Sequence, residues 1–204
     1  VQDGATLTDG AGFGGQNVSQ AVANVLTGRV NPSGRLTETY AYSVKDIPSE
    51  HTRRDENVMV YEEGLNVGYR YFATENVPVL YPFGYGLSYS QFRYSDLSVK
   101  VNGDTVEVSL CVENISDKDG KEVVQLYIHE QTPVVYRPVR ELKAFEKVLI
   151  KAHEKKQIVL ALDREAFAYY STQKNQWTVN EGTFAIQIGR NANEILLEKQ
   201  IAFA

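Results

Sequence analysis

Val106 to Val112 reads VEVSLCV, and the alternation of its side chains decides the fold class. Apolar residues occupy every second position, and polar or small ones lie between them: Val106, Val108, Leu110 and Val112 against Glu107, Ser109 and Cys111. Successive side chains of a β-strand point to opposite faces of a sheet. The pattern therefore predicts a strand with one buried and one exposed face.

The same parity recurs further along the chain. Three more segments carry it: Ile158, Leu160 and Leu162; Phe184, Ile186 and Ile188; Ile195, Leu197, Ile201 and Phe203. Turn sequences separate such segments: NGD at 102–104, SDKDG at 116–120 and NEG at 180–182. About seven short strands over about 110 residues predict a mainly β fold, a β-sandwich of the immunoglobulin or fibronectin type III kind over residues 91–204.

The composition excludes several classes of function. The chain has 204 residues, 43% of them hydrophobic, and a net charge of -5 with its basic residues dispersed, which argues against nucleic-acid and anionic-membrane partners. No apolar run approaches the roughly 18 residues of a membrane span. The lone Cys111 is the sole hint of a reducing, cytoplasmic location, so the location stays open between cytoplasm and secretion. Three scattered histidines lack ligand spacing, and we expect neither a metal nor a cofactor.

Residues 1–39 form a different zone. The segment 17–28, NVSQAVANVLTG, has apolar residues near helical spacing and a glycine where a helix would stop, and the turn NPSGRL follows. Gly10, Gly12 and Gly15 satisfy G-x-G-x-x-G, but VQDGATLTD before them is no buried strand, so a loop is the preferred interpretation over a dinucleotide site. We expect this zone to be part of a longer protein.

Residues 40–90 predict an ordered connector between domains. They hold most of two aromatic runs, YEEGLNVGYRYF at 61–72 and YPFGYGLSYSQFRY at 81–94, which contain ten of the 22 aromatic residues. Each buried ring is worth about 4–6 kcal/mol before entropy is subtracted, whereas ten exposed rings would form a sticky patch. We therefore predict a packing seam rather than a sugar-stacking platform, with Gly84 and Gly86 allowing close backbone approach. The residues expected to pack between domains or line a cleft edge are Tyr61, Tyr69, Tyr71, Phe72, Tyr81, Phe83, Tyr85 and Tyr89.

Two charged segments invite functional interpretations. Glu62 and Glu63 are adjacent acids, but neighbours on an extended chain point to opposite faces, so this pair alone does not predict a glycosidase site. One acid paired with a base such as Arg70 and one solvated is the expected arrangement. The segment 137–147, RPVRELKAFEK, predicts an edge strand with its apolar residues under the sandwich and with Arg140, Glu141 and Lys143 solvated.

These motifs together resemble glycoside hydrolase family 3 β-glucosidases. NVSQAVANVLTGRVNPSGRLTET is similar to the end of that family's α/β-sandwich domain, the two aromatic runs to its connector, and GKEVVQLYI with RPVRELKAFEKV to its fibronectin type III-like domain. The resemblance covers roughly residues 13 to 204 with the motifs in order. Residues 4–15 lack the apolar strand usual before the helix, and Ala152-His153 replaces a Pro-Gly turn.

The resemblance implies a retaining enzyme that hydrolyses terminal β-linked sugars, with missing barrel and α/β domains as partners. The family's nucleophile is an aspartate on the barrel, commonly in an S-D-W context that this sequence lacks, and its general acid lies upstream of the portion present here. We therefore expect no catalytic residue in this chain and no activity from it alone. The alternatives are a stand-alone carbohydrate-binding module that uses the connector rings, and a protein-docking module.

Overall fold

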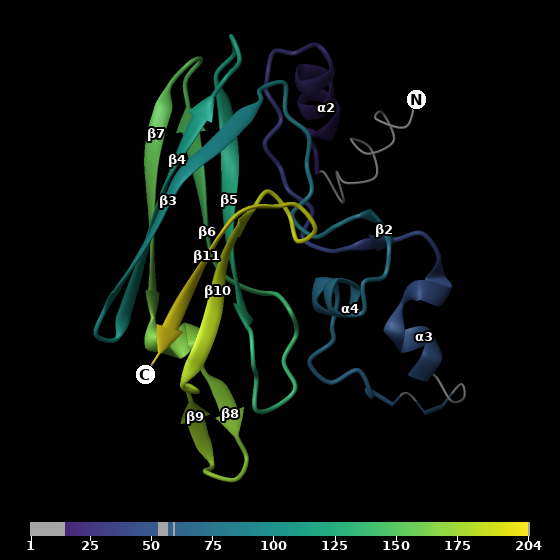
Figure 1. Ribbon diagram of the computed structural model, residues 1–204. Helices are drawn as coiled ribbons and strands as arrows, with labels where there is room; N and C mark the ends of the chain where they lie inside the picture. The colour runs from purple at the N-terminus through teal and green to yellow at the C-terminus, as the bar shows by residue number, and fades with distance from the viewer. Residues whose placement is uncertain (1–14, 53–56, 59, 204) are drawn as a thin grey trace.

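The computed structural model describes residues 15–52, 57, 58 and 60–203 (Figure 1). Gly10 and Gly12 of the glycine motif lie outside the described residues. Within the described part, no helix is both long and apolar enough to cross a membrane.

The C-terminal part is a sandwich of two antiparallel sheets, which confirms the predicted fold class. One sheet has the strand order β11-β10-β5-β6 and the other the order β3-β4-β7. The strands are β3 (Phe92–Asn102), β4 (Thr105–Asn114), β5 (Gly120–Glu130), β6 (Glu141–Ile150), β7 (Lys155–Asp163), β10 (Gly182–Gly189) and β11 (Ile195–Phe203). The 3₁₀ turn η2 (Arg164–Phe167) and a small hairpin of β8 (Tyr169–Ser171) and β9 (Gln176–Thr178) lie at one end.

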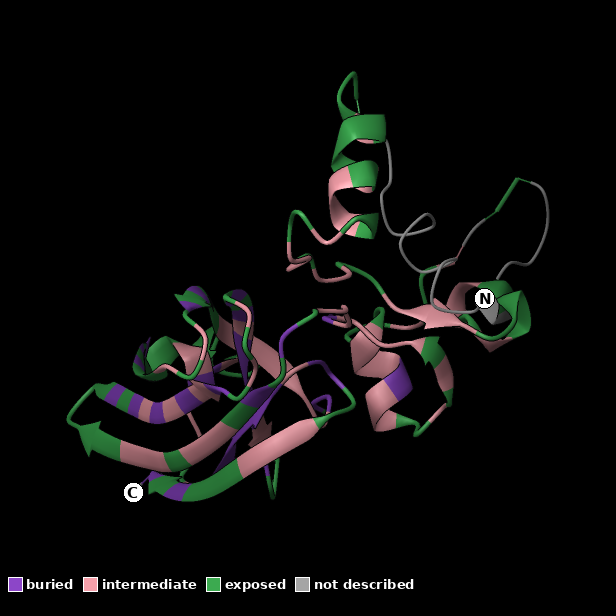
Figure 2. Cartoon of the chain, turned by 90° about the horizontal axis from the view of Figure 1, so that it is seen from above, coloured by how far each residue is buried: buried purple, intermediate pink, exposed green. Residues whose placement is uncertain are grey.

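The core lies between the two sheets, where the alternating side chains meet. Val106, Val108, Leu110 and Val112 of β4 are all at most 1% exposed, as the pattern predicts. They pack against apolar residues of the facing sheet, including Val124, Leu126, Ile128, Phe184, Ile186 and Ile188. Figure 2 shows buried segments concentrated in the sandwich. The helix α2 (Val18–Leu26) is instead exposed or half-buried throughout.

Before the sandwich, the described residues form short elements. They are α2 (Val18–Leu26), β1 (Tyr40–Ala41), the 3₁₀ turn η1 (Val44–Asp46), α3 (Pro48–Thr52), α4 (Tyr69–Thr74) and β2 (Val79–Tyr81). The helix predicted within 17–28 is α2, and it ends before Gly28, whose φ of +71° suits glycine. The 40–90 segment is more regular than its composition indicates, because α4 and the β1–β2 pair form within it.

The expectation for residues 137–147 is partly wrong. β6 is an edge strand as predicted, but the side chains of Glu141 and Lys143 are only 14% and 19% exposed and pair with each other at 3.0 Å. Arg137 is 4% exposed and pairs with Glu130 at 2.9 Å and with Glu141 at 2.6 Å. Buried charges are stable only when they are paired, and these side chains remain buried because each has an oppositely charged partner. Phe145 is instead 66% exposed.

Candidate functional site at the connector–sandwich junction

Asn31, in the turn NPSGRL, ties the N-terminal zone to the start of the sandwich. Its side-chain amide donates to Ser90 Oγ at 2.7 Å and to the Asp119 carbonyl at 2.9 Å. Its Oδ1 accepts from Ser88 Oγ at 3.0 Å and from Tyr89 N at 2.8 Å. One side chain therefore joins three segments far apart in the sequence.

Arg35 reaches from the same turn into the sandwich. Leu36 N donates to the Tyr85 carbonyl and Gly84 N to the Leu36 carbonyl, both at 2.8 Å, so the backbone beside Arg35 runs against the connector. Arg35 Nη2 lies 2.6 Å from Glu122 Oε2 on β5, and their side chains are 11% and 2% exposed. The other Glu122 oxygen accepts from Tyr94 OH at 2.8 Å. Burial and the adjacent Glu122 carboxylate raise the pKa of Tyr94, so its hydroxyl stays protonated as a donor.

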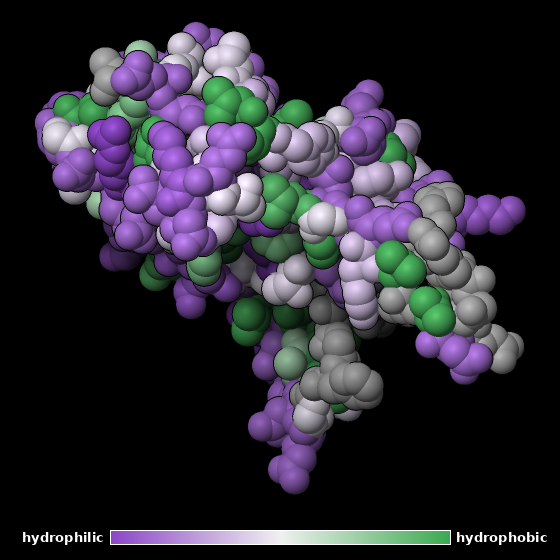
Figure 3. Space-filling view, turned by 90° about the horizontal axis from the view of Figure 1, so that it is seen from below, coloured by the Kyte–Doolittle hydropathy of each residue, from purple (hydrophilic) through white to green (hydrophobic). Residues whose placement is uncertain are grey.

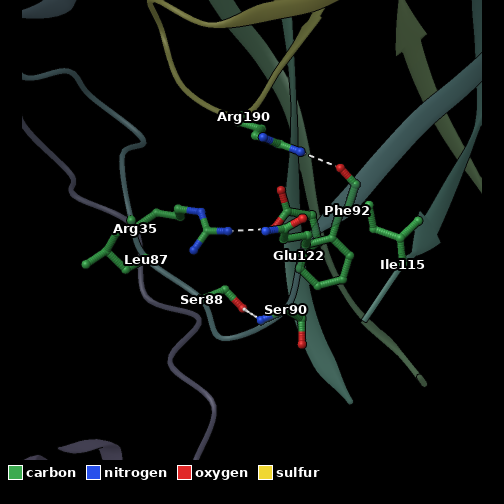
Figure 4. Close-up of a pocket in the computed structure, with 10 residues that line it drawn as sticks. Arg35, Leu87, Ser88, Ser90, Phe92, Ile115, Glu122 and Arg190 are labelled. Atoms are coloured by element: carbon green, nitrogen blue, oxygen red, sulfur yellow. Dashed lines mark hydrogen bonds and ion pairs between the residues drawn. The ribbon is translucent and has the colours of Figure 1, made fainter. Parts of the chain in front are cut away.

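A pocket of about 320 Å³ opens beside this ion pair (Figure 4). Arg35 enters it from the N-terminal turn and Arg190 from the loop between β10 and β11, where Arg190 donates to the Phe92 carbonyl. Glu122 is the only carboxylate among the lining residues, and both of its oxygens are occupied. Hydrolysis of a glycosidic bond needs two carboxyls flanking that bond. This pocket therefore lacks the groups for that chemistry.

Gly84 lies close against the sandwich, as predicted. A Cβ at Gly84 would lie 2.2 Å from Oε1 of the buried Gln125, and one at Gly86 would lie 2.2 Å from the Gly34 carbonyl. Gln125 donates to the carbonyls of Gly84 and Arg190 and accepts from Tyr127 OH at 2.6 Å. A buried side-chain amide of β5 thus forms a hydrogen bond with the connector backbone.

Several rings named from the sequence pack in this junction. Tyr69 stacks on Phe83 with 4.8 Å between ring centroids and meets Tyr127 of β5 edge-on at 5.9 Å. Its hydroxyl accepts from Leu142 N of β6 at 2.8 Å. Phe72, next along α4, is 6% exposed. These contacts join α4 to the face of the β5–β6 pair.

The other named rings have different neighbours. Tyr81 contacts Tyr85 at 5.1 Å and Tyr40 at 6.4 Å, and Tyr71 contacts Phe72 at 5.3 Å, all within the N-terminal half. Tyr89 is 48% exposed, donates to the Val25 carbonyl at 2.8 Å and lies under Lys118. Tyr61 is 77% exposed. Their packing against other domains stays a prediction.

The two adjacent acids differ in burial. Glu62 is exposed, whereas Glu63 is half-buried, and its Oε2 is buried with no hydrogen-bond partner among the described residues. Nor does the described part of the chain hold a group of three or more His, Cys, Asp or Glu side chains that could bind a metal ion.

Two family models match the chain on either side of this junction. The glycosyl hydrolase family 3 C-terminal domain matches residues 10–89, and the fibronectin type III-like domain matches residues 122–192. The chain belongs to glycosyl hydrolase family 3.

Its relatives in family 3 are longer proteins. Thermostable beta-glucosidase B of Acetivibrio thermocellus is 44% identical over 93% of this chain, and an exo-alpha-(1->6)-L-arabinopyranosidase of Bifidobacterium breve is 40% identical over 89%. The solved structure of beta-glucosidase 3B from Thermotoga neapolitana in complex with glycerol is 39% identical over 93% of the chain, with a TM-score of 0.87. The chain spans about a quarter of each: 26%, 24% and 27%.

The junction contacts link the two family 3 regions. Arg35 and Tyr69 lie in the segment matched by the C-terminal domain, and their partners Glu122 and Tyr127 lie in the fibronectin-like segment. Glu122, which binds Arg35, and Gln125, which binds the Gly84 carbonyl, were missed from the sequence, and so was the buried Arg137. The signal that could have found the first two is a charged and an amide residue inside the apolar run EVVQLYI, which a buried strand tolerates only with partners.

Proposed function

We propose that this chain is a non-catalytic packing module of a larger retaining glycosidase that removes terminal β-linked sugars, a β-glucosidase or a related β-glycosidase. The chain's share of its relatives, about a quarter, carries the proposal together with the names of those relatives. In the parent enzyme one carboxylate attacks the anomeric carbon. The other protonates the leaving oxygen and later activates water. Both belong to parts outside this chain.

The contribution of this chain is to hold the sandwich rigidly against the rest of the enzyme. Support comes from the Arg35–Glu122 pair, the Asn31 hydrogen bonds and the Tyr69–Tyr127 contact, which fix the N-terminal half of the chain on the sandwich. Positioning matters because a change far from the active site that displaces the reacting groups by about 1 Å can lower the rate about 10²-fold.

The internal stacking of Tyr69 on Phe83 favours this role over a stand-alone sugar platform. A ring whose face is already covered by another ring offers little surface to a sugar. Affinity electrophoresis of the chain on several β-glucans tests this: unchanged mobility is expected, and retardation abolished by Tyr69→Ala would support the binding module instead.

The activity of the parent is tested with the complete gene product. Purified gene product is expected to release aryl alcohol from an aryl β-glucoside, with aryl α-L-arabinopyranoside as the second substrate because one relative carries that name. Absence of turnover on every aryl glycoside of a broad panel would contradict the proposal.

A further inference from the structure

The pocket beside the Arg35–Glu122 pair has no part in the function proposed above. Its walls come from the N-terminal turn, from the segment 86–92 and from strands and loops of the sandwich. Its volume of about 320 Å³ lies at the lower end of the range in which proteins bind small molecules, roughly 300–1,000 Å³. We call it the junction pocket, and its lining includes Arg35, Leu87, Phe92, Ile115, Glu122 and Arg190.

Positive charge exceeds negative charge in the lining of the junction pocket. The lining contains two guanidinium groups, those of Arg35 and Arg190, and one carboxylate, that of Glu122. Both oxygens of Glu122 are already occupied, one by Arg35 and the other by Tyr94. Glu194, outside the lining, pairs with Arg190 at 3.3 Å, but both side chains are more than a third exposed, and solvent weakens such a pair. The pocket therefore favours an anion as its ligand.

Both guanidinium groups are held in place before any ligand arrives. Each makes two hydrogen bonds to described residues, and that of Arg190 also lies 5.8 Å from the centroid of the Tyr94 ring. An arginine has five N–H donors in a planar fork that matches a carboxylate, so each side chain keeps donors for a ligand after these bonds are made. Side chains that are already fixed lose little entropy when they bind.

The lining also has an apolar part. Leu87, Phe92 and Ile115 contribute it (Figure 4). Apolar surface that a ligand removes from water contributes favourably to binding. A bare inorganic anion leaves these carbon atoms in contact with water, whereas an organic anion covers them with its own carbon atoms. The lining thus fits an anion with an apolar body better than an inorganic ion.

We propose that the junction pocket binds a small organic carboxylate, whose charged end contacts Arg35 and Arg190 and whose apolar body covers Phe92. Arg35 lies in the segment matched by the family 3 C-terminal domain, and Arg190 lies in the fibronectin type III-like segment. The ligand therefore bridges the two segments. Its contacts all lie within this chain, so it does not depend on the function proposed above.

Calorimetric titration of the complete gene product tests this site, with benzoate as the probe. Apolar side chains also reach the surface over the sandwich and the connector (Figure 3), so the neutral benzamide, which has a similar shape, measures the background binding of an aromatic ring. Benzoate is expected to bind at least tenfold more tightly than benzamide, because only benzoate makes charge-assisted hydrogen bonds with both guanidinium groups. Inorganic phosphate, which has no apolar body, is expected to bind more weakly than benzoate.

Two variants locate the binding. Arg190→Met removes one guanidinium group, and Ile115→Glu adds a carboxylate to the lining at a position that is 38% exposed. The matched controls are Arg93→Met and Val159→Glu, which change exposed side chains outside the lining. Both pocket variants are expected to lower the affinity for benzoate at least tenfold, and both controls to leave it unchanged. Ile115→Glu decides the test alone where Arg190→Met does not fold.

Equal affinities for benzoate and benzamide would overturn the proposed site, and so would an absence of benzoate binding. Benzoate binding that survives in every folded pocket variant would also overturn it, because the ligand would then lie elsewhere in the gene product. Phosphate that binds as tightly as benzoate would overturn the assignment of an organic ligand, since the apolar part of the lining would then contribute nothing.

Discussion

Arg35 joins the segment that matches the family 3 C-terminal domain to the fibronectin type III-like segment. Its guanidinium is nearly buried against a fully buried carboxylate, and Tyr94 occupies the second carboxylate oxygen. A buried ion pair adds little net stability over apolar residues of similar volume, but removal of one partner strands the other charge out of water. The pair therefore makes the position of the turn specific.

Replacing Arg35 by methionine is expected to destabilise the chain by about 3–5 kcal/mol, because Glu122 keeps only Tyr94 as a partner. Urea unfolding measures the change. Arg93→Met is the matched control: its pair with Glu113 is exposed and 3.4 Å long, and the expected change stays within about 1 kcal/mol. Similar losses of unfolding free energy in both variants would contradict this role of the Arg35–Glu122 pair.

Gly84 gives a second test at the scale of one residue. Gly84→Ala and Gly103→Ala both place a Cβ at positive φ, +82° and +59°, which costs about 1–2 kcal/mol each. Only Gly84→Ala also drives a methyl group into Gln125, and overpacking adds about 1–3 kcal/mol. The midpoint of thermal unfolding should therefore be well below that of Gly103→Ala in the Gly84→Ala variant. Equal midpoints would show that Gln125 moves aside freely.

At the scale of elements, α4 is the helix that carries the connector onto the sandwich. It has six residues, too few for a stable isolated helix, so its stability comes from packing. Phe72 supplies a buried ring, and Tyr69 supplies both a stacked ring and an acceptor for the backbone of β6.

Tyr69→Phe keeps the ring and removes the acceptor of Leu142 N, which is expected to cost about 1–3 kcal/mol. Tyr61→Phe, at a position that is 77% exposed, is the control and should leave stability unchanged. Hydrogen exchange locates the effect: the Leu142 amide should exchange faster in Tyr69→Phe only. An unaltered Leu142 amide would mean that water replaces the hydroxyl.

The carboxyl group of Glu141, at the start of β6, should make the free energy of unfolding depend on pH. Burial alone would raise the pKa of Glu141, but the charges of Lys143 and Arg137 outweigh it and lower the pKa. A carboxyl with a lowered pKa in the folded state stabilises the fold above its unfolded pKa of about 4.3, and loses that effect as the pH falls through the folded pKa. Unfolding free energies measured between roughly pH 6 and 3 should therefore fall less steeply for Glu141→Gln than for the parent chain. Parallel curves would rule out this contribution.

At the scale of the whole molecule, periodicity predicted the sandwich and could not predict the junction. Strands such as β4 bury one face locally, so alternation along Val106–Val112 is sufficient evidence for them. The Arg35–Glu122 pair joins residues 87 positions apart, and no local pattern encodes that distance. Aromatic content predicted which segment packs, but not that Tyr69 contacts the sandwich while Tyr81 contacts Tyr40.

The buried charges near β6 were missed for a related reason. Residue type alone places Arg137 and Glu141 in solvent, because arginine and glutamate are rarely buried without partners. Each is the other's partner, with Glu130 as a third member from the neighbouring strand. Such a network is visible only when the strands are aligned side by side.

In the function proposed above, the chain positions catalytic carboxylates that belong to other parts of the enzyme. The most direct measurement is the rate at which the purified 204-residue chain hydrolyses an aryl β-glucoside, compared with the complete gene product under the same conditions. We expect no turnover above the uncatalysed rate for the chain and clear turnover for the gene product. Turnover by the chain alone that is lost in Glu62→Gln or Glu63→Gln would contradict it.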